Sequence, residues 1–261
     1  MSEFVISRDG TRIAYDHVGQ GPAIILVAAA MQFRGFDPAT AEMGRQLAAR
    51  GFTVVNYDRR GRGESAEATS FTLQDELDDI TALIAVVGGE AALFGSSSGG
   101  AICLAAAAAG LPITKLALWE VPLGAENGSA GAAFFNGLRA RITAGDREGT
   151  VEYYMKDMPP EWLAGAKQSP SWPTMVALGH SLAGDAEALA WAQSAPHAEL
   201  WAAITQPTVA LIGAQTLPIM PLAADAIVAA LPHAHKLTIQ AANHGWAPEV
   251  MATALGDFLA S

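Results

Sequence analysis

The chain has 261 residues, of which 51% are hydrophobic, and its 26 acidic and 15 basic residues give a formal net charge of −11. This hydrophobic content excludes a disordered chain, and the length suits one large α/β domain or a domain with an insertion. The acidic balance, with no basic run beyond "DRRGR" at 58–62, argues against nucleic acid or an anionic membrane as a partner.

The first ten residues, "MSEFVISRDG", have neither the basic nor the apolar segment of a signal peptide, and no later apolar stretch is long enough to span a bilayer. Cys103 is the one cysteine, so no internal disulfide can form, and its alanine-rich surroundings are typical of a buried thiol. We expect a cytoplasmic location. The sequence leaves the oligomeric state open.

Predicted strands recur along most of the chain. Residues 3–18 predict two strands joined at Asp9-Gly10, a strong hairpin signal. Continuous apolar runs, typical of strands covered on both faces, occur at 22–30, 52–58, 91–95, 115–120, 207–213 and 235–240.

Helices are predicted between these strands. Asp37 and Pro38 begin a helix that ends before Gly51, and Thr72 and Asp75 have capping-box spacing at the start of the next. Further helices are predicted at 99–110, 222–232 and 248–260. The alternation indicates an α/β fold with a mostly parallel central sheet and helices on both faces.

The alternation stops between about residues 121 and 205, where helix-length segments are broken by prolines and no buried strand is evident. We therefore predict one core domain formed by residues 1–121 and 206–261, interrupted by a helical insertion at 122–205.

Gly95-Ser96-Ser97-Ser98-Gly99 separates a predicted strand from a predicted helix. Gly-x-Ser-x-Gly in that context is the pattern of a nucleophile elbow, a sharp turn that raises the central serine above the sheet. It predicts Ser97 as a nucleophile and the backbone N–H of Ser98, at the helix N-terminus, as an oxyanion donor. A simple glycine turn is the alternative interpretation in a chain with 26 glycines.

A serine hydroxyl needs a base to take its proton. His244 follows the last predicted strand, at the edge where ligands gather in α/β sheets, and is the candidate. His233 and His235 precede that strand, so they are expected at the opposite edge. The other histidines lie in the early hairpin, at His17, or in the insertion, at His180 and His197.

Four segments together resemble the α/β-hydrolase superfamily, in particular its small serine hydrolases with a helical cap. They are "YDRRGRGES" at 57–65, "GSSSGG" at 95–100, "LALWEVP" at 116–122 and "NHGWAPE" at 243–249. The resemblance covers nearly the whole chain and implies an α/β-hydrolase fold, with Ser97 as nucleophile, His244 as base and residues 58–65 as a structural turn. It implies the backbone N–H of Ala30 as second oxyanion donor, although many relatives carry His-Gly where this chain has "LVAAAMQFRG".

The acid also departs from the family pattern. Thr216 stands where many members carry Asp. Glu120 directly follows a buried strand, where some members place their acid, and it keeps the order Ser, acid, His. A carboxylate at such a position needs a partner, so we expect it to orient His244, with a salt bridge at a domain junction as the alternative.

We expect a serine hydrolase that cleaves a small hydrophobic ester, thioester or lactone through an acyl-enzyme on Ser97. The partner is then a small-molecule substrate, and no cofactor or metal is needed. The insertion suggests an apolar cap through Phe134, Phe135, Met155, Met158, Trp162, Trp172, Met175, Trp191 and Trp201. A lyase or cofactor-free haloperoxidase would use the same triad, and a ligand receptor on this scaffold is a further alternative.

Overall fold

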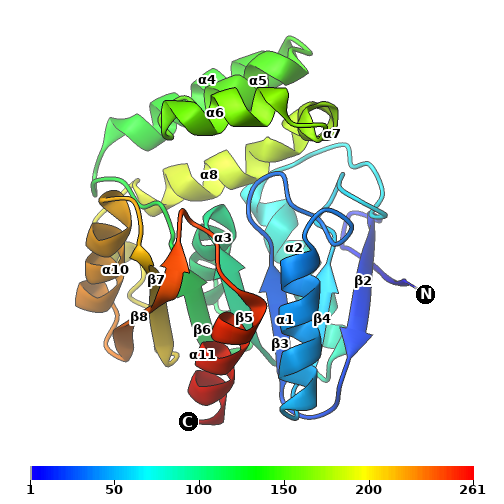
Figure 1. Ribbon diagram of the computed structural model, residues 1–261, viewed down its shortest axis with the longest axis vertical. Helices are drawn as coiled ribbons and strands as arrows, with labels where there is room; N and C mark the ends of the chain where they lie inside the picture. The colour runs from blue at the N-terminus through cyan, green and yellow to red at the C-terminus, as the bar shows by residue number, and fades with distance from the viewer. Residues whose placement is uncertain (1) are drawn as a thin grey trace.

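The computed structural model describes residues 2–261, within which eight strands form one sheet in the order β1-β2-β4-β3-β5-β6-β7-β8 (Figure 1). The strands are β1 (Glu3–Ile6), β2 (Arg12–Val18), β3 (Ala23–Val27), β4 (Thr53–Tyr57), β5 (Ala91–Ser96), β6 (Ile113–Trp119), β7 (Thr208–Gln215) and β8 (Ala234–Ala242). Each corresponds to a strand predicted from the sequence.

The hairpin at the N-terminus accounts for the antiparallel part of the sheet. β1 pairs with β2 and β2 with β4 in antiparallel register, whereas the pairs from β4 to β8 are parallel. Gly10 has a φ of 89° in the turn between β1 and β2, a conformation that glycine adopts without steric cost. The predicted mostly parallel sheet is confirmed.

Helices cover both faces of the sheet. α1 (Pro38–Ala49) and α11 (Pro248–Ala260) pack on one face, and α2 (Leu73–Val86), α3 (Ser98–Ala108) and α10 (Ile219–Ala230) pack on the other. Consecutive residues of one strand point to opposite faces: Ile24 packs in the core under α1 and α11, whereas Ile25 packs in the core under α2, α3 and α10. This two-sided burial explains the continuous apolar runs.

The helix starts follow the local signals in the sequence. The Asp37 side chain accepts a hydrogen bond from the N–H of Thr40 at the start of α1. At the start of α2, Thr72 and Asp75 form both bonds of a capping box.

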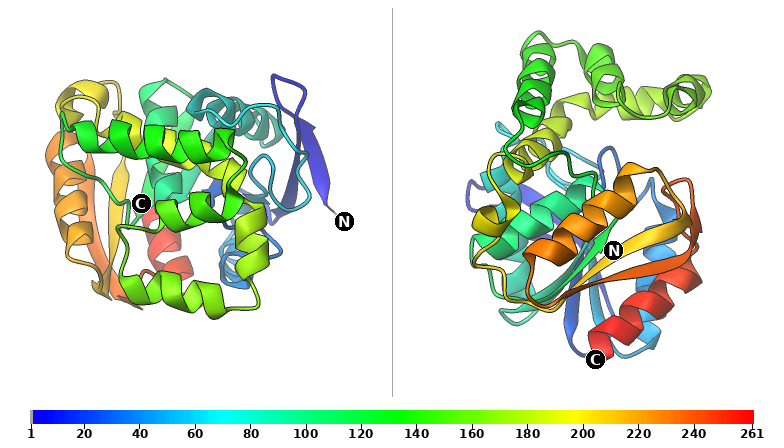
Figure 2. Two further views of the ribbon diagram at one scale, coloured as in Figure 1. Left: turned by 90° about the horizontal axis from the view of Figure 1, so that it is seen from above. Right: turned by 90° about the vertical axis from the view of Figure 1, so that its left-hand side faces the viewer.

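Residues 122–205 lie between β6 and β7 and contain helices but no strand. Within this described segment the helices are α4 (Ser129–Thr143), α5 (Arg147–Tyr154), α6 (Pro160–Gln168), α7 (Trp172–Ala177), the 3-10 helix η1 (Gly179–Ser181), α8 (Leu182–Ala192) and α9 (His197–Leu200). We call residues 122–205 the helical segment. Figure 2 shows α4 to α7 standing over one edge of the sheet, with α8 between them and α3.

That edge is where the parallel strands end. The loops after β3, β5, β6 and β8 carry Ala30, Ser97, Glu120 and His244, respectively. Parallel strands bring the residues that follow them to one edge, however far apart they lie in the sequence. Among residues 2–261, no helix combines the length and apolar character needed to cross a membrane.

Candidate active site

Ser97 occupies a sharp turn between β5 and α3. Its φ of 54° and ψ of −122° lie outside the regions that most residues adopt, and its N–H donates to the Trp119 carbonyl at 2.8 Å. The glycines allow the close approach that this turn requires. A Cβ on Gly95 would lie 2.6 Å from the Gly100 Cα, and one on Gly99 would lie 2.4 Å from the Val27 carbonyl oxygen. The strand, the turn and the helix N-terminus therefore have the form of a nucleophile elbow.

The structure brings Glu120 and His244 together. Glu120 follows β6, His244 follows β8, and Nδ1 of His244 lies 2.6 Å from Oε2 of Glu120. The Trp119 indole N–H donates to the His244 carbonyl at 3.3 Å, which holds the histidine loop against β6. A carboxylate bonded to Nδ1 leaves Nε2 of the imidazole free to act as a base.

Glu120 is buried and fully engaged in hydrogen bonds. Its Oε1 accepts the Gly213 N–H at 2.9 Å, and its Oε2 bonds to His244. Burial by itself would raise the pKa of Glu120, but the bond with His244, the nearby Thr216 hydroxyl and the Gly213 N–H together lower this pKa below its ordinary value. Thr216, at the position where the family pattern has Asp, thus lies near the Glu120 carboxylate.

Left-handed backbone is concentrated around this site. Within residues 2–261, six non-glycine residues have positive φ, and four of them are Met31 (60°), Ser97 (54°), Glu120 (40°) and His244 (65°). Such conformations cost free energy and persist where the surrounding structure enforces them, which is common in active sites.

Of the two predicted oxyanion donors, the backbone N–H groups of Ser98 and Ala30, the second already has a hydrogen-bond partner in the structure. The N–H of Ser98 stands at the N-terminus of α3 and has no acceptor among the described residues. The N–H of Ala30, by contrast, donates to the Ser98 hydroxyl at 3.1 Å. No local pattern in the sequence could predict this bond, because it joins a backbone group to a side chain 68 residues away.

Asp185 and two arginines of "DRRGR", Arg59 and Arg62, form a buried cluster that could not be predicted from the sequence. Arg59 and Arg62 each pair with the Asp185 carboxylate, at 2.6 and 2.5 Å, and Arg59 also pairs with Glu76 at 2.7 Å. All four side chains are essentially inaccessible to solvent. The two cations and two carboxylates balance one another, as buried charges require. The sequence signal for such a cluster was three arginines within four residues. The acidic partners of Arg59 and Arg62 could not be identified from it, because those residues lie on other elements, α2 and α8.

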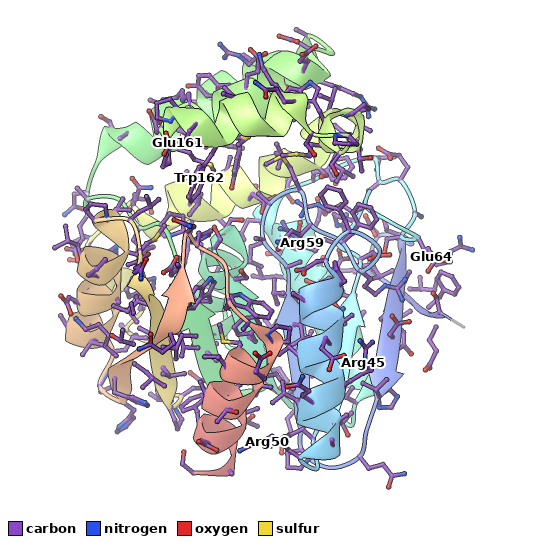
Figure 3. All side chains as sticks on the ribbon, in the orientation of Figure 1. Arg45, Arg50, Arg59, Glu64, Glu161 and Trp162 are labelled. Atoms are coloured by element: carbon purple, nitrogen blue, oxygen red, sulfur yellow. The ribbon has the colours of Figure 1, made fainter. Side chains whose placement is uncertain are left out.

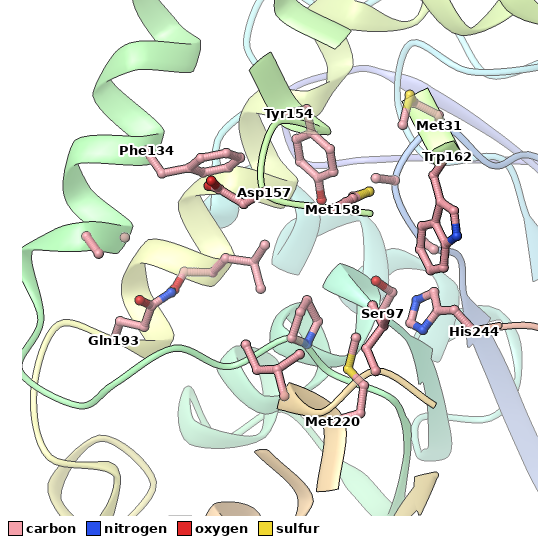
Figure 4. Close-up of a pocket in the computed structure, with 18 of the residues that line it drawn as sticks. Met31, Ser97, Phe134, Tyr154, Asp157, Met158, Trp162, Gln193, Met220 and His244 are labelled. Carbon is pink, nitrogen blue, oxygen red and sulfur yellow. The ribbon is translucent and has the colours of Figure 1, made fainter. Parts of the chain in front are cut away.

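A cavity of about 400 Å³ separates the helical segment from the ends of the strands. Ser97 and His244 lie side by side on its floor, and Trp162 and Tyr154 point into it from above (Figure 4). Its apolar wall is formed by Met31, Phe134, Met158, Trp162, Leu189, Leu217, Ile219 and Met220. Asp157 and Gln193 add polar groups. The cavity therefore offers an apolar ligand a place beside a serine and a histidine.

Comparison with known proteins identifies the family. A model of the "Alpha/beta hydrolase family" matches residues 24–255. The chain belongs to this family. The predicted resemblance to the α/β-hydrolase superfamily is thus confirmed, and the protein is a hydrolase. A search of curated proteins found no matching sequence.

Solved structures agree with this assignment. An alpha/beta hydrolase from Sphaerobacter thermophilus is 33% identical and has a TM-score of 0.85, over 98% of this chain and 100% of that one. A hydrolase from Pseudomonas aeruginosa is 25% identical, with a TM-score of 0.76 over 100% and 98%. A thermophilic esterase from Thermogutta terrifontis, 20% identical over 100% and 98% with a TM-score of 0.71, shares the fold.

The aromatic and methionine side chains of this hydrolase's helical segment lie in three places. Phe134, Met158 and Trp162 line the cavity. Others pack within the helical segment, namely Phe135, Met155, Trp172 and Met175. Trp191 and Trp201 pack instead against the core of the sheet.

The remaining histidines of the hydrolase lie away from the cavity. His180 is close to Glu67, at 2.7 Å, and His197 stacks on Trp201 with 4.1 Å between ring centroids. His235 packs near Phe258. Among the described residues, His244 is the histidine that lines the cavity.

Proposed function

We propose that the protein is a serine hydrolase that cleaves a small hydrophobic ester, thioester or lactone through an acyl-enzyme on Ser97. The proposal rests above all on one arrangement: Ser97 and His244 share the floor of an apolar cavity, and His244 is hydrogen-bonded to the buried Glu120. A serine, a histidine and a carboxylate in this relation have the parts of a catalytic triad.

In the first half of the reaction, the Ser97 Oγ attacks the substrate carbonyl while its proton moves to Nε2 of His244. Glu120 keeps Nδ1 protonated and stabilises the imidazolium that forms. His244 then gives the proton to the departing alcohol or thiol, which leaves an ester on Ser97. In the second half, His244 takes a proton from water, the hydroxide adds to the acyl carbon, and the acid leaves as the proton returns to Ser97.

Negative charge develops on the carbonyl oxygen in both halves. We assign its stabilisation to the backbone N–H groups of Ser98 and Ala30. The Ser98 N–H benefits from the positive end of the α3 dipole. The Ala30 N–H would be shared between the substrate oxygen and the Ser98 hydroxyl that it contacts at 3.1 Å.

The cavity supports the substrate class. About 400 Å³ suits a small molecule, and the wall is mostly apolar. Much of that wall comes from the helical segment, through Phe134, Met158 and Trp162, so we propose that residues 122–205 act as a cap. The esterase from Thermogutta terrifontis provides a precedent for ester substrates on this fold.

Active-site labelling and pre-steady-state kinetics test the proposal. A fluorophosphonate probe should label the protein at Ser97, and Ser97→Ala should abolish both labelling and hydrolysis of p-nitrophenyl butyrate. Ser96→Ala, which removes the neighbouring hydroxyl, is the matched control and should keep both. The wild type should release a burst of p-nitrophenol followed by steady turnover. Labelling without turnover would instead favour the receptor alternative, and failure to label folded protein would exclude Ser97 as the nucleophile.

A further inference from the structure

The loop Ala28–Met31, which follows β3 and carries the proposed second oxyanion donor, has three alanines and a methionine. None of these side chains can form a strong hydrogen bond. The local support is two long bonds between Ala29 and Gln32: the Ala29 N–H donates to the Gln32 side chain, and the Gln32 N–H donates to the Ala29 carbonyl, each at 3.3 Å. Three consecutive residues are held by buried groups from elsewhere. Arg59 donates to the Ala28 carbonyl at 3.2 Å, and Arg62 donates to the Ala29 carbonyl at 2.9 Å. The Ala30 N–H donates to the Ser98 hydroxyl at 3.1 Å.

The three groups that hold the loop meet at a single carboxylate. Oδ1 of Asp185 accepts hydrogen bonds from Arg59 and from the Ser98 hydroxyl, each at 2.6 Å, and Oδ2 accepts one from Arg62 at 2.5 Å. Asp185 and Ser98 are completely buried. Figure 3 shows Arg59 in the interior, beneath the helical segment. The carboxylate is thus the one group that contacts all three groups that hold the loop, while Glu76 and Ser181 give Arg59 and Arg62, respectively, further support.

Ser98 connects this cluster to the nucleophile elbow. Its backbone N–H is the first proposed oxyanion donor, and its side chain contacts the second. Because the hydroxyl donates a hydrogen bond to a carboxylate, its oxygen becomes a stronger acceptor for the Ala30 N–H. Asp185 belongs to α8, so the group at the centre of the cluster comes from the helical segment and not from the sheet.

We propose that Asp185 is a positioning residue, which acts through Ser98, Arg59 and Arg62 to orient the loop Ala28–Met31 and its N–H donor beside Ser97. The inference rests on the proposed serine hydrolase function. It means that the helical segment contributes to the chemical step as well as to the cavity wall. Catalysis should then depend on the contact between α8 and the elbow even for substrates too small to reach the apolar wall.

The test compares Asp185→Asn and Ser98→Ala with wild type, using p-nitrophenyl acetate as substrate and an alkylboronic acid as inhibitor. The boronic acid forms a tetrahedral anion on the serine, so its affinity reports on the oxyanion donors. For Asp185→Asn, kcat should fall by about tenfold or more, toward the 10²- to 10³-fold lost when an oxyanion donor is removed, with KM within about twofold of wild type. The affinity for the boronic acid should fall in parallel. Ser98→Ala should change both quantities in the same direction.

Ser65→Ala is the matched control. The Ser65 hydroxyl, like that of Ser98, donates one hydrogen bond, to the Asp58 carbonyl at 2.5 Å, and accepts one from a backbone N–H, that of Ala14, at 2.8 Å. It lies outside the cluster, so Ser65→Ala should lower the thermal midpoint but leave kcat and boronic acid affinity unchanged. Ser98→Ala retains every charge, and so it tests the inference even if Asp185→Asn does not fold.

The experiment distinguishes failure of the positioning role from failure of the proposed function. If wild type hydrolyses the ester but Asp185→Asn and Ser98→Ala keep its kcat and boronic acid affinity, the positioning role is wrong and the proposed function stands. If wild type shows neither turnover nor fluorophosphonate labelling, the proposed function fails, and this inference fails with it.

Discussion

The carboxylate of Glu120 lies 2.6 Å from Nδ1 of His244, although 124 residues separate the two in the sequence. Their strands, β6 and β8, are not neighbours, because β7 lies between them. Gly213 of β7 makes the contact possible: its N–H donates to the same carboxylate, and a Cβ there would lie 3.2 Å from Oε1 of Glu120. The geometry gives Glu120 the contact that a triad acid needs, with Thr216 beside it.

Glu120→Gln tests the role of the acid. An amide can present its NH2 group to Nδ1 and so favour the wrong imidazole tautomer, and it cannot stabilise an imidazolium. We expect kcat for p-nitrophenyl butyrate to fall by about 10⁴-fold, the loss typical of a triad whose acid becomes an amide. Glu90→Gln, which makes the same change at an exposed position, should retain activity. Comparable activity in both variants would mean that Glu120 serves only the fold.

Gly99→Ala tests the close packing of the elbow. The added methyl would lie 2.4 Å from the Val27 carbonyl oxygen, and neither backbone segment can move without disturbing β3 or α3. Overpacking of this kind costs about 1–3 kcal/mol in the free energy of unfolding, which urea titration measures. Gly165→Ala is the control, because that glycine lies in α6 with no atom within 4 Å of the added methyl. It should stabilise the protein by about 0.5–1 kcal/mol through helix propensity.

Trp162→Ala tests the contribution of the helical segment to specificity. The indole of Trp162 lies over the imidazole of His244, with 6.3 Å between ring centroids, and forms part of the cavity wall. Its removal should lower kcat/KM for short acyl chains by roughly tenfold and move the optimum of a p-nitrophenyl acetate-to-decanoate series toward longer chains. Trp172→Ala should leave the chain-length profile unchanged, because Trp172 packs within the helical segment. Identical profiles in both variants would contradict a role for Trp162 at the substrate.

Asp75→Asn tests a pH-dependent contribution to stability. Burial would raise the pKa of Asp75, but hydrogen bonds from Thr72 and Ser70 and the charge of Arg60 lower it in the folded protein. The folded state therefore binds this proton less readily than the unfolded state, so the stabilisation is present above about pH 4 and is lost as pH falls through the lowered pKa. The variant should lose about 1 kcal/mol at pH 7 and show a flatter decline of unfolding free energy below pH 4.

Urea titration at pH 7 and pH 3 measures the effect of Asp75→Asn. Asp78→Asn alters the same helix outside the capping box, where Asp78 accepts a bond from Gln74 at 3.0 Å, and should follow the wild-type pH profile. If wild type and Asp75→Asn have equal unfolding free energies at pH 7 and also at pH 3, Asp75 does not make this pH-dependent contribution.

Much of the fold could be predicted because its signals are local. A strand buried on both faces needs a continuous apolar run, and a capped helix needs a side-chain oxygen at its first turn. Both conditions are met within a few residues, as β3 and Thr72 illustrate. The elbow is equally local, because Ser97 is raised by the glycines beside it. Ser97 and the position of His244 after the last strand could therefore be inferred from short stretches of sequence.

The sequence by itself thus determined the order of strands and helices and the strand ends that carry Ser97, Glu120 and His244. Tertiary structure decided which groups meet there. Glu120 reaches His244 across β7, the Ala30 N–H is engaged by Ser98, and Asp185 joins α8 to the elbow. These contacts span 68 to 124 residues. Sequence periodicity describes the faces of single elements, whereas such contacts depend on how elements pack, which no local pattern encodes.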